Sequence, residues 1–182
     1  VRVKGISKNL CITLPNKSQF CDMRVYKRIN DVYEVELPDC KKYFQFLQSD
    51  SALLGGDVIA IFNEKYDKHL SPDVGDIIKG SVEYCCHTTI NLGVKEGLWK
   101  KYGNTPTNIE LSNIYFRNYV DEPCIRKRCW HIWQVNGAIH SFDEIPDYVV
   151  NSYVTYLFPP KSVYHKMMYG CFIGEELWPI QR

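Results

Sequence analysis

Short runs of β-favouring residues mark the first part of the chain. Residues 10–14 and 32–37 are rich in such residues, and the second run, Val-Tyr-Glu-Val-Glu-Leu, partly alternates between apolar and polar positions. Alternation with a period of two is typical of a strand that buries one face. We therefore expect two or three strands before residue 38.

From Pro38 the apolar positions change their spacing. They now stand at i, i+3, i+4 and i+7, at Cys40, Tyr43, Phe44 and Leu47. This spacing is that of one face of an α-helix, Pro38 suits a first helical turn, and Gly55 and Gly56 supply a stop. The pattern predicts an amphipathic helix with its aromatic face on the core.

The middle of the chain returns to β character. Residues 57–63 and 76–84 are predicted to be strands, and a loop with Pro72 and Gly75 separates them. Further β-favouring runs cover residues 88–94, 97–101 and 107–114. Four or five short strands with turn residues between them favour a small closed barrel.

The last third predicts a hairpin, then helices. Residues 129–142 give two strands around Asn136-Gly137, a strong hairpin turn signal. A second helix is expected from the capping-box spacing of Ser141 and Glu144 to Pro159. Its apolar stripe is Val150, Tyr153, Val154 and Leu157. A short helix is expected at residues 163–170. Because strands outnumber helices in these predictions, the expected fold class is mainly β, with α+β character.

Length and charge limit the function classes. The 182 residues, 45% of them hydrophobic, suffice for one substantial core, so we expect one domain. The formal net charge of +1 creates no bulk field that would draw the chain to nucleic acid. No apolar run is long enough to cross a bilayer, so we expect no membrane contact.

Eight cysteines leave two interpretations open. An even count in a secreted protein suggests a disulfide framework, whereas scattered cysteines with apolar neighbours, such as Cys11, behave as buried free thiols. Cys124, Cys129 and His131 offer three zinc donors but lack a CxxC pair. We favour reduced structural thiols and expect neither a metal nor a cofactor.

The order strands, helix, compact β unit, strands, helix resembles an extended Tudor domain, in which a Tudor barrel is inserted into a staphylococcal-nuclease-like OB fold. Residues 56–64, Gly-Asp-Val-Ile-Ala-Ile-Phe-Asn-Glu, resemble the opening strand of that family. Residues 102–105, Tyr-Gly-Asn-Thr, with residues 109–114 resemble its turn and following strand. The resemblance implies one module over 1–182, with a barrel core at 56–118, a nuclease-like portion at 1–55 and 119–182, and a linking helix.

The resemblance also implies a peptide-binding site. Members of the family hold methylarginine in an aromatic cage, because a diffuse cation gains from several ring faces. The matching positions here are Phe62 or Tyr66, Trp99, Tyr102 and the hydrogen-bonding Asn104. Lys101 stands where the family's turn has aspartate, and it opposes a cationic guest, so we expect a degenerate cage.

The resemblance therefore implies a non-catalytic adaptor for an Argonaute or Piwi-class protein, or its cofactor, in small-RNA silencing or germ granules. It would work in the cytoplasm, perinuclear granules or the nucleus. One alternative is an OB-fold module for single-stranded nucleic acid, with phosphate contacts from a basic set. That set is Lys100, Lys101, Arg126, Lys127 and Arg128. Another is a secreted, disulfide-linked β protein that modulates a host immune response. No spacing specifies a catalytic site, so we do not expect an enzyme.

Overall fold

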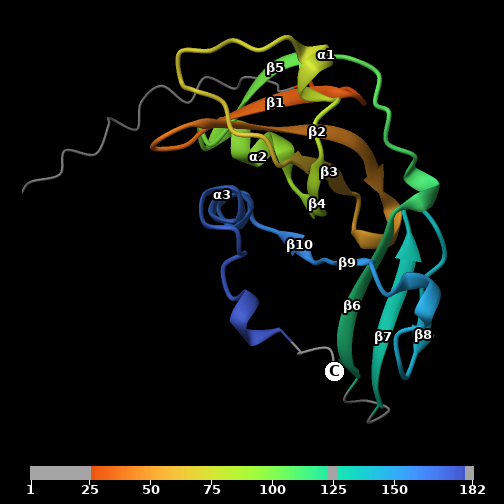
Figure 1. The fold of residues 1–182 in the computed structure, drawn as a ribbon. Coiled ribbons are helices and arrows are strands. Elements are labelled where there is room, and N and C mark those ends of the chain that lie inside the picture. Colours follow the sequence, from red (N-terminus) through yellow and green to blue (C-terminus); the bar gives the residue numbers. More distant parts are fainter. Residues whose placement is uncertain (1–25, 123–126, 179–182) are drawn as a thin grey trace, which may run out of the picture.

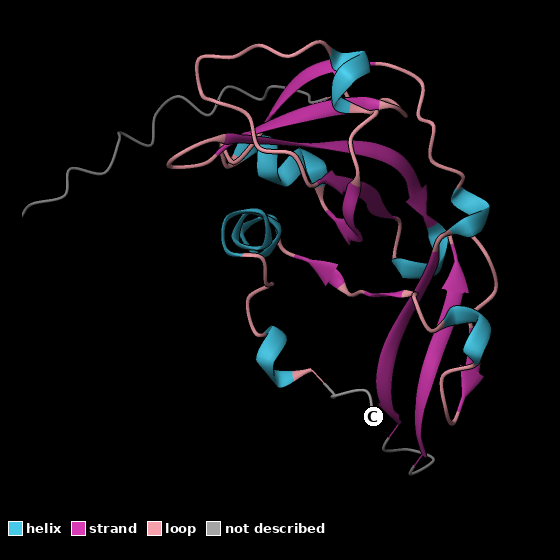
Figure 2. Cartoon of the chain, viewed as in Figure 1, coloured by secondary structure: helices cyan, strands magenta, loops and turns pink. Residues whose placement is uncertain are grey.

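The chain folds into two β-sheets accompanied by short helices, as a computed structural model of residues 26–122 and 127–178 shows (Figure 1, Figure 2). One sheet has six strands and the other has four. The expected mainly β, α+β class is confirmed. The run at residues 10–14, expected to be a strand, lies outside the described residues.

The six-stranded sheet is antiparallel except at one edge. From edge to edge its strands are β10 (Leu157–Phe158), β4 (Val82–Thr88), β3 (Gly56–Phe62), β2 (Lys41–Asp50), β1 (Asp31–Glu36) and β5 (Lys100–Asn104). Only β10 and β4 run parallel. The strand order has two ends, so the sheet is open and does not close into the barrel expected from its short strands.

The four-stranded sheet is built on a hairpin. Its order is β8 (His140–Phe142), β7 (Lys127–Gln134), β6 (Tyr115–Glu122) and β9 (Tyr153–Val154). The turn between β7 and β8 contains Asn136 at φ 58°, a left-handed conformation that asparagine tolerates, and Gly137 follows it. The predicted Asn-Gly hairpin is confirmed.

Three α-helices pack on the six-stranded sheet. Helices α2 (Ile90–Lys95) and α3 (Pro160–Tyr169) contribute to the same core cluster, so they cover one face. Helix α1 (Val74–Ile77) buries Ile77 in a different cluster, on the opposite face. Helix α3 confirms the short helix expected near the C-terminus. It ends at Gly170, whose φ of 81° is accessible to glycine at little cost.

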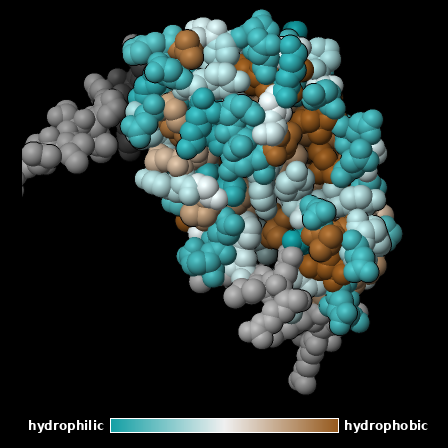
Figure 3. Space-filling view, in the orientation of Figure 1, coloured by the Kyte–Doolittle hydropathy of each residue, from teal (hydrophilic) through white to brown (hydrophobic). Residues whose placement is uncertain are grey.

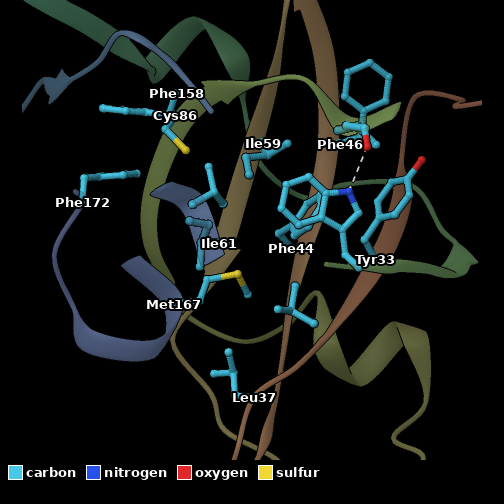
Figure 4. Close-up of a cluster of buried hydrophobic side chains, with 14 residues drawn as sticks. Tyr33, Leu37, Phe44, Phe46, Ile59, Ile61, Cys86, Phe158, Met167 and Phe172 are labelled. Atoms are coloured by element: carbon cyan, nitrogen blue, oxygen red, sulfur yellow. Dashed lines mark hydrogen bonds between the residues drawn. The ribbon is translucent and has the colours of Figure 1, made fainter. Parts of the chain in front are cut away.

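The cores on the two faces follow the strand period of two. Tyr33, Phe44, Phe46, Ile59 and Ile61 point into the cluster under α2 and α3, which Figure 4 shows. Their neighbours along the strands face the other way. These neighbours pack with α1 or with the four-stranded sheet: Val32, Tyr43, Leu47, Val58, Ala60 and Phe62. The central strands are therefore apolar on both faces.

The helix expected after Pro38 is wrong, because residues 41–50 form strand β2. All six residues from Lys42 to Leu47 are buried, and β2 pairs with β1 on one side and β3 on the other. A strand with both faces covered has apolar residues at odd and even positions, and three of them, Tyr43, Phe44 and Leu47, happen to match a helical stripe.

The helix expected between Ser141 and Pro159 is also wrong. That segment forms β8, a 3-10 turn over Asp147–Val149, β9 and β10. It pairs with β6 through Tyr153 and with β4 through Leu157, so it crosses from one sheet to the other. These tertiary pairings override the local apolar stripe.

Three of the strands predicted in the middle of the chain also differ. Residues 76–84 cover the end of α1, a turn and the start of β4, and residues 88–94 cover the end of β4 and most of α2. Residues 107–114 contain only a 3-10 turn, Leu111–Asn113. The strands of the six-stranded sheet come from both sides of residue 56, since β2 pairs with β3 and β1 pairs with β5. The expected boundary at that residue therefore does not separate two sheets.

Candidate functional site

Three of the five expected cage residues lie in one cluster. Phe62, Tyr66 and Tyr102 pack with Tyr43 on the face that α1 covers. The ring centre of Tyr43 lies 5.4 Å from that of Tyr66 and 5.0 Å from that of Tyr102. Phe62 is 1% exposed, and the Tyr102 hydroxyl donates to the carbonyl of Pro72 at 2.6 Å. These rings pack against one another as part of the core and leave no cage between them for a guest.

The other two expected cage residues lie elsewhere. Trp99 belongs to the cluster on the opposite face, with its ring edge-on to Phe44 at 5.2 Å. Its Nε1 donates to the carbonyl of Ile90 at 3.0 Å, the dashed line in Figure 4. The Asn104 side chain donates to the carbonyl of Ile29 and to Asp31. The structure therefore does not bring the five residues together as a cage.

The basic residues considered for nucleic-acid contact are paired or fall outside the description. Lys101 forms an ion pair with Asp31 at 2.7 Å, and Lys100 forms one with Glu34 at 3.0 Å. Lys127 and Arg128 begin strand β7, but their side chains, and all of Arg126, lie outside the described residues. A phosphate would therefore have to compete with Glu34 and Asp31 for the ammonium groups of Lys100 and Lys101.

Trp99 instead lies at the bottom of a groove of about 440 Å³, which we call the Trp99 groove. Its lining comes from β1, from α2 and the turn after it, from the start of β5 and from α3: Glu34, Glu36, Val94, Gly97, Leu98, Trp99, Lys100 and Tyr164. Gly93 lets the indole approach α2, because a Cβ at that position would lie 2.0 Å from a ring carbon of Trp99. The volume falls in the range of typical ligand sites.

The groove combines an apolar floor with a charged rim. Burial alone would raise the pKa of Glu34, but hydrogen bonds from Lys100 and Tyr43, with the charge of Lys41, lower it below the ordinary value. Glu34 therefore stays ionised while 2% exposed. Glu36, at the end of β1, is exposed, and its main-chain carbonyl accepts a hydrogen bond from the Tyr164 hydroxyl at 3.2 Å.

A second polar group lies fully buried between the sheets. His87 Nε2 lies 2.8 Å from Asp50 Oδ2, and His87 Nδ1 lies 3.1 Å from Thr155 Oγ1. These are the chemical groups of a nucleophilic triad, but the ring nitrogens are exchanged, because the triad pairs Nδ1 with the carboxylate and Nε2 with the hydroxyl. All three residues are 0% exposed, and neither described pocket is lined by any of them.

The bonds of this group run from one sheet to the other. Asp50, on β2, also accepts from Trp133 Nε1 on β7 and from the main-chain N–H groups of Ala52 and Asn136. Burial lowers the pKa of His87 more than Asp50 raises it, so the imidazole is neutral and donates from Nε2. The arrangement fastens the two sheets together.

The described cysteines are free thiols. Cys40, Cys85, Cys86, Cys129 and Cys171 form no disulfide with one another. Burial raises the pKa of Cys85 to about 12, and that of Cys86 well above its ordinary value. A thiol that does not ionise is a poor nucleophile and a poor metal ligand. Within residues 26–122 and 127–178, no group of three or more His, Cys, Asp or Glu side chains is arranged to hold a metal ion.

Sequence reasoning identified Trp99 and Lys100 but missed the other residues that line the groove. Tyr164 lies more than 60 positions further along the chain, on a helix that no local motif links to Trp99. Glu34 and Glu36 gave only a weak signal of a site, because acidic residues at alternate positions of a strand are also expected on any solvent-facing side of a sheet.

The chain matches no protein-family model, no curated protein and no solved structure. Among the described residues, no helix has the length and apolar character that crossing a membrane requires.

Proposed function

We propose that the chain is a non-catalytic interaction module that binds a short, extended segment of a partner protein in the Trp99 groove. The observation that carries this proposal is the position of the groove beside the end of strand β1. Strand β5 pairs with β1 only from Asp31 to Glu34, and Val35 and Glu36 extend beyond it.

A strand edge without a neighbouring strand offers peptide N–H and C=O groups to an incoming chain, which at the Glu36 carbonyl would replace the exposed hydrogen bond from the Tyr164 hydroxyl. A bound segment would extend the sheet from the point where β5 begins, next to Val35 and Glu36. Alternate side chains of that segment would then face the apolar floor formed by Val94, Leu98 and Trp99. Main-chain pairing supplies affinity in this mode, and side-chain pockets supply specificity.

The charges on the rim favour a basic residue in the bound segment. Glu34 is shared between Lys41 and Lys100, whereas Glu36 carries its carboxylate at the exposed end of the strand. Lys100 is 68% exposed along its side chain, so it can move away at little cost. An arginine or lysine of the partner would then take its place beside the two carboxylates.

The resemblance to extended Tudor domains adds a class of partner. An Argonaute or Piwi-class protein, or a cofactor of one, would be recruited in small-RNA silencing or germ granules, in the cytoplasm. The expected cage residues are divided between two faces of the sheet. Binding in the Trp99 groove therefore does not depend on arginine methylation.

Selection from a displayed library of random peptides tests the proposal. The selected peptides should pair apolar residues at alternate positions with one arginine or lysine. Their affinities, measured by fluorescence anisotropy, should fall about tenfold or more with Leu98→Ser or Tyr164→Ala, the loss expected at the centre of an interface. Methylating the arginine of a selected peptide should leave the affinity unchanged.

Leu92→Ser is the matched control, because Leu92 is 44% exposed on α2 and lies outside the groove. Peptides that bind all three variants as tightly as the unaltered chain would place the site elsewhere and refute the proposal. A library that yields no binder at all would also refute the proposal.

A further inference from the structure

A second pocket lies on the four-stranded sheet. It holds about 210 Å³ beside the β7–β8 hairpin, and we call it the hairpin pocket. The side chains that shape it include Tyr115, Gln134, His140, Phe142 and Tyr148. Its volume is below that of typical sites for drug-sized ligands. It therefore fits a single small group, such as the end of a side chain.

The aromatic wall of the pocket is held in place from behind. The ring of Tyr148 stands edge-on to that of Tyr115, with the ring centres 6.1 Å apart. Tyr148 belongs to the 3-10 turn Asp147–Val149, whose Val149 is 2% exposed. The buried Arg117 donates to the carbonyls of Val149 and Val150 and to the Ser152 hydroxyl. The pocket is therefore preorganised although Tyr148 itself is 68% exposed.

The surroundings of the pocket are acidic. Residues 143–147 join Phe142 to Tyr148, and they include the exposed Asp143, Glu144 and Asp147. Each of these is at most two positions from a lining residue, so it lies within about 7 Å of one along the chain. From Gln134 to Leu157 the sequence contains neither lysine nor arginine. The guanidinium of Arg117 is already committed to the hydrogen bonds behind the turn.

We propose that the hairpin pocket binds a methylated ammonium group on a lysine side chain of a protein. Ring faces attract a cation, and its methyl groups gain from leaving water when they contact aromatic walls. The neighbouring carboxylates strengthen this attraction and repel anions. They disfavour the phosphate that accompanies a choline headgroup, so a modified side chain fits better than a lipid. Hydrophobic surface beside the four-stranded sheet is visible in Figure 3.

Three probes test the ligand chemistry by NMR titration of the full chain. They are a short uncharged peptide with one trimethyllysine, the same peptide with the uncharged tert-butyl carbon isostere of that residue, and phosphocholine. The trimethyllysine peptide should bind, and it should bind about tenfold more tightly than the isostere, as a cation at an aromatic site predicts. Resonances of Tyr115, Phe142 and Tyr148 should shift.

Tyr148→Leu should weaken binding of the trimethyllysine peptide by about tenfold, because it removes one ring face while keeping an apolar side chain. Tyr169→Leu is the control, since Tyr169 is 65% exposed on α3, away from the pocket. Equal binding of the peptide and its isostere would show an apolar pocket and overturn the proposal. Binding of phosphocholine alone, or unchanged affinity in Tyr148→Leu, would overturn it as well.

Discussion

Asp50 shows how one residue can hold two sheets together. Its carboxylate accepts four hydrogen bonds, from the side chains of His87 and Trp133 and from the main-chain N–H groups of Ala52 and Asn136. Burial would raise its pKa, but these donors, beginning with Asn136, lower it below the ordinary value. The carboxylate is therefore charged in the folded protein, and its two side-chain donors, His87 and Trp133, are buried with it.

Asp50→Ala should be among the most destabilising single changes in the chain. It leaves two buried side-chain donors, those of His87 and Trp133, without this partner, and each costs about 1–3 kcal/mol when unsatisfied. We expect the free energy of unfolding to fall by at least ~3 kcal/mol in urea denaturation. Glu96→Ala, at an exposed position, should change it by less than ~0.5 kcal/mol. A loss below ~1 kcal/mol for Asp50→Ala would mean that the two sheets are not joined there.

His87 should make stability depend on pH. Its folded-state pKa lies below the ordinary 6.5, mainly because of burial. As the pH falls below about 6.5, the unfolded chain takes up a proton before the folded chain does, so the free energy of unfolding decreases. Above about pH 7 both states are neutral, and this contribution does not vary. Asp50 adds a further loss only as the pH falls through its own lowered pKa.

The measurement is the urea midpoint at several values between pH 5 and pH 7.5. His87→Gln removes the titrating ring and keeps a donor for Asp50, so its midpoint should change less over this range. His69→Gln, which removes an exposed imidazole, should retain the original pH dependence. Identical slopes for the unaltered chain and His87→Gln would contradict the assignment.

The apolar pattern of strand β2 led to the wrong prediction of a helix. A helical stripe and a two-sided strand share positions such as Tyr43, Phe44 and Leu47, and the pattern cannot tell them apart. The difference lies at Gln45, which a helix would turn toward water. In the strand Gln45 is 0% exposed, and its amide donates to the carbonyl of Thr105 at 2.8 Å.

Gln45→Ala should therefore destabilise the protein by about 1–2 kcal/mol, because it removes the donor to the part-buried main-chain carbonyl of Thr105. Gln48→Ala is the matched control, since Gln48 stands in the same strand at a partly exposed position. Denaturant unfolding of both variants gives the comparison. Equal, small effects would fit a solvent-facing Gln45 and contradict the strand.

Elements with strong local signals were predicted well, and those set by distant partners were not. The alternation in β1, the apolar run in β3 and the Asn-Gly turn between β7 and β8 each depend on neighbouring residues. The segment 150–157 depends on distant ones, because Tyr153 pairs with Phe116 and Leu157 pairs with His87. The same limit applies to the Trp99 groove, since Tyr164 reaches it only through the packing of α3.

At the scale of the whole molecule, the sheets tie together segments that the sequence suggested were separable. Residues 56–118 were expected to hold a barrel core of their own. Within that range β3 pairs with β4, but the other neighbour of β3 is β2, and β5 pairs with β1. Phe116 on β6 packs with Leu47 from β2 and with Trp133 from β7, both outside the range.

A fragment of residues 56–118 should therefore fail to fold. Its strands would lose most of their pairing, and Ile59, Ile61 and Ala60, all 0% exposed in the chain, would lie open to water. A pair of strands without a covered face is at best marginally stable. Circular dichroism should show no cooperative transition for the fragment, and NMR should show little dispersion of its resonances, whereas residues 26–178 should unfold cooperatively.

Adding residues 26–55 as a separate peptide supplies β1 and β2. The core faces that α3 and β7 cover in the chain would still be exposed, so the peptide should not rescue the fragment. A cooperative transition of 56–118 alone would restore the independent barrel and show that the sheet pairings across residue 56 are dispensable.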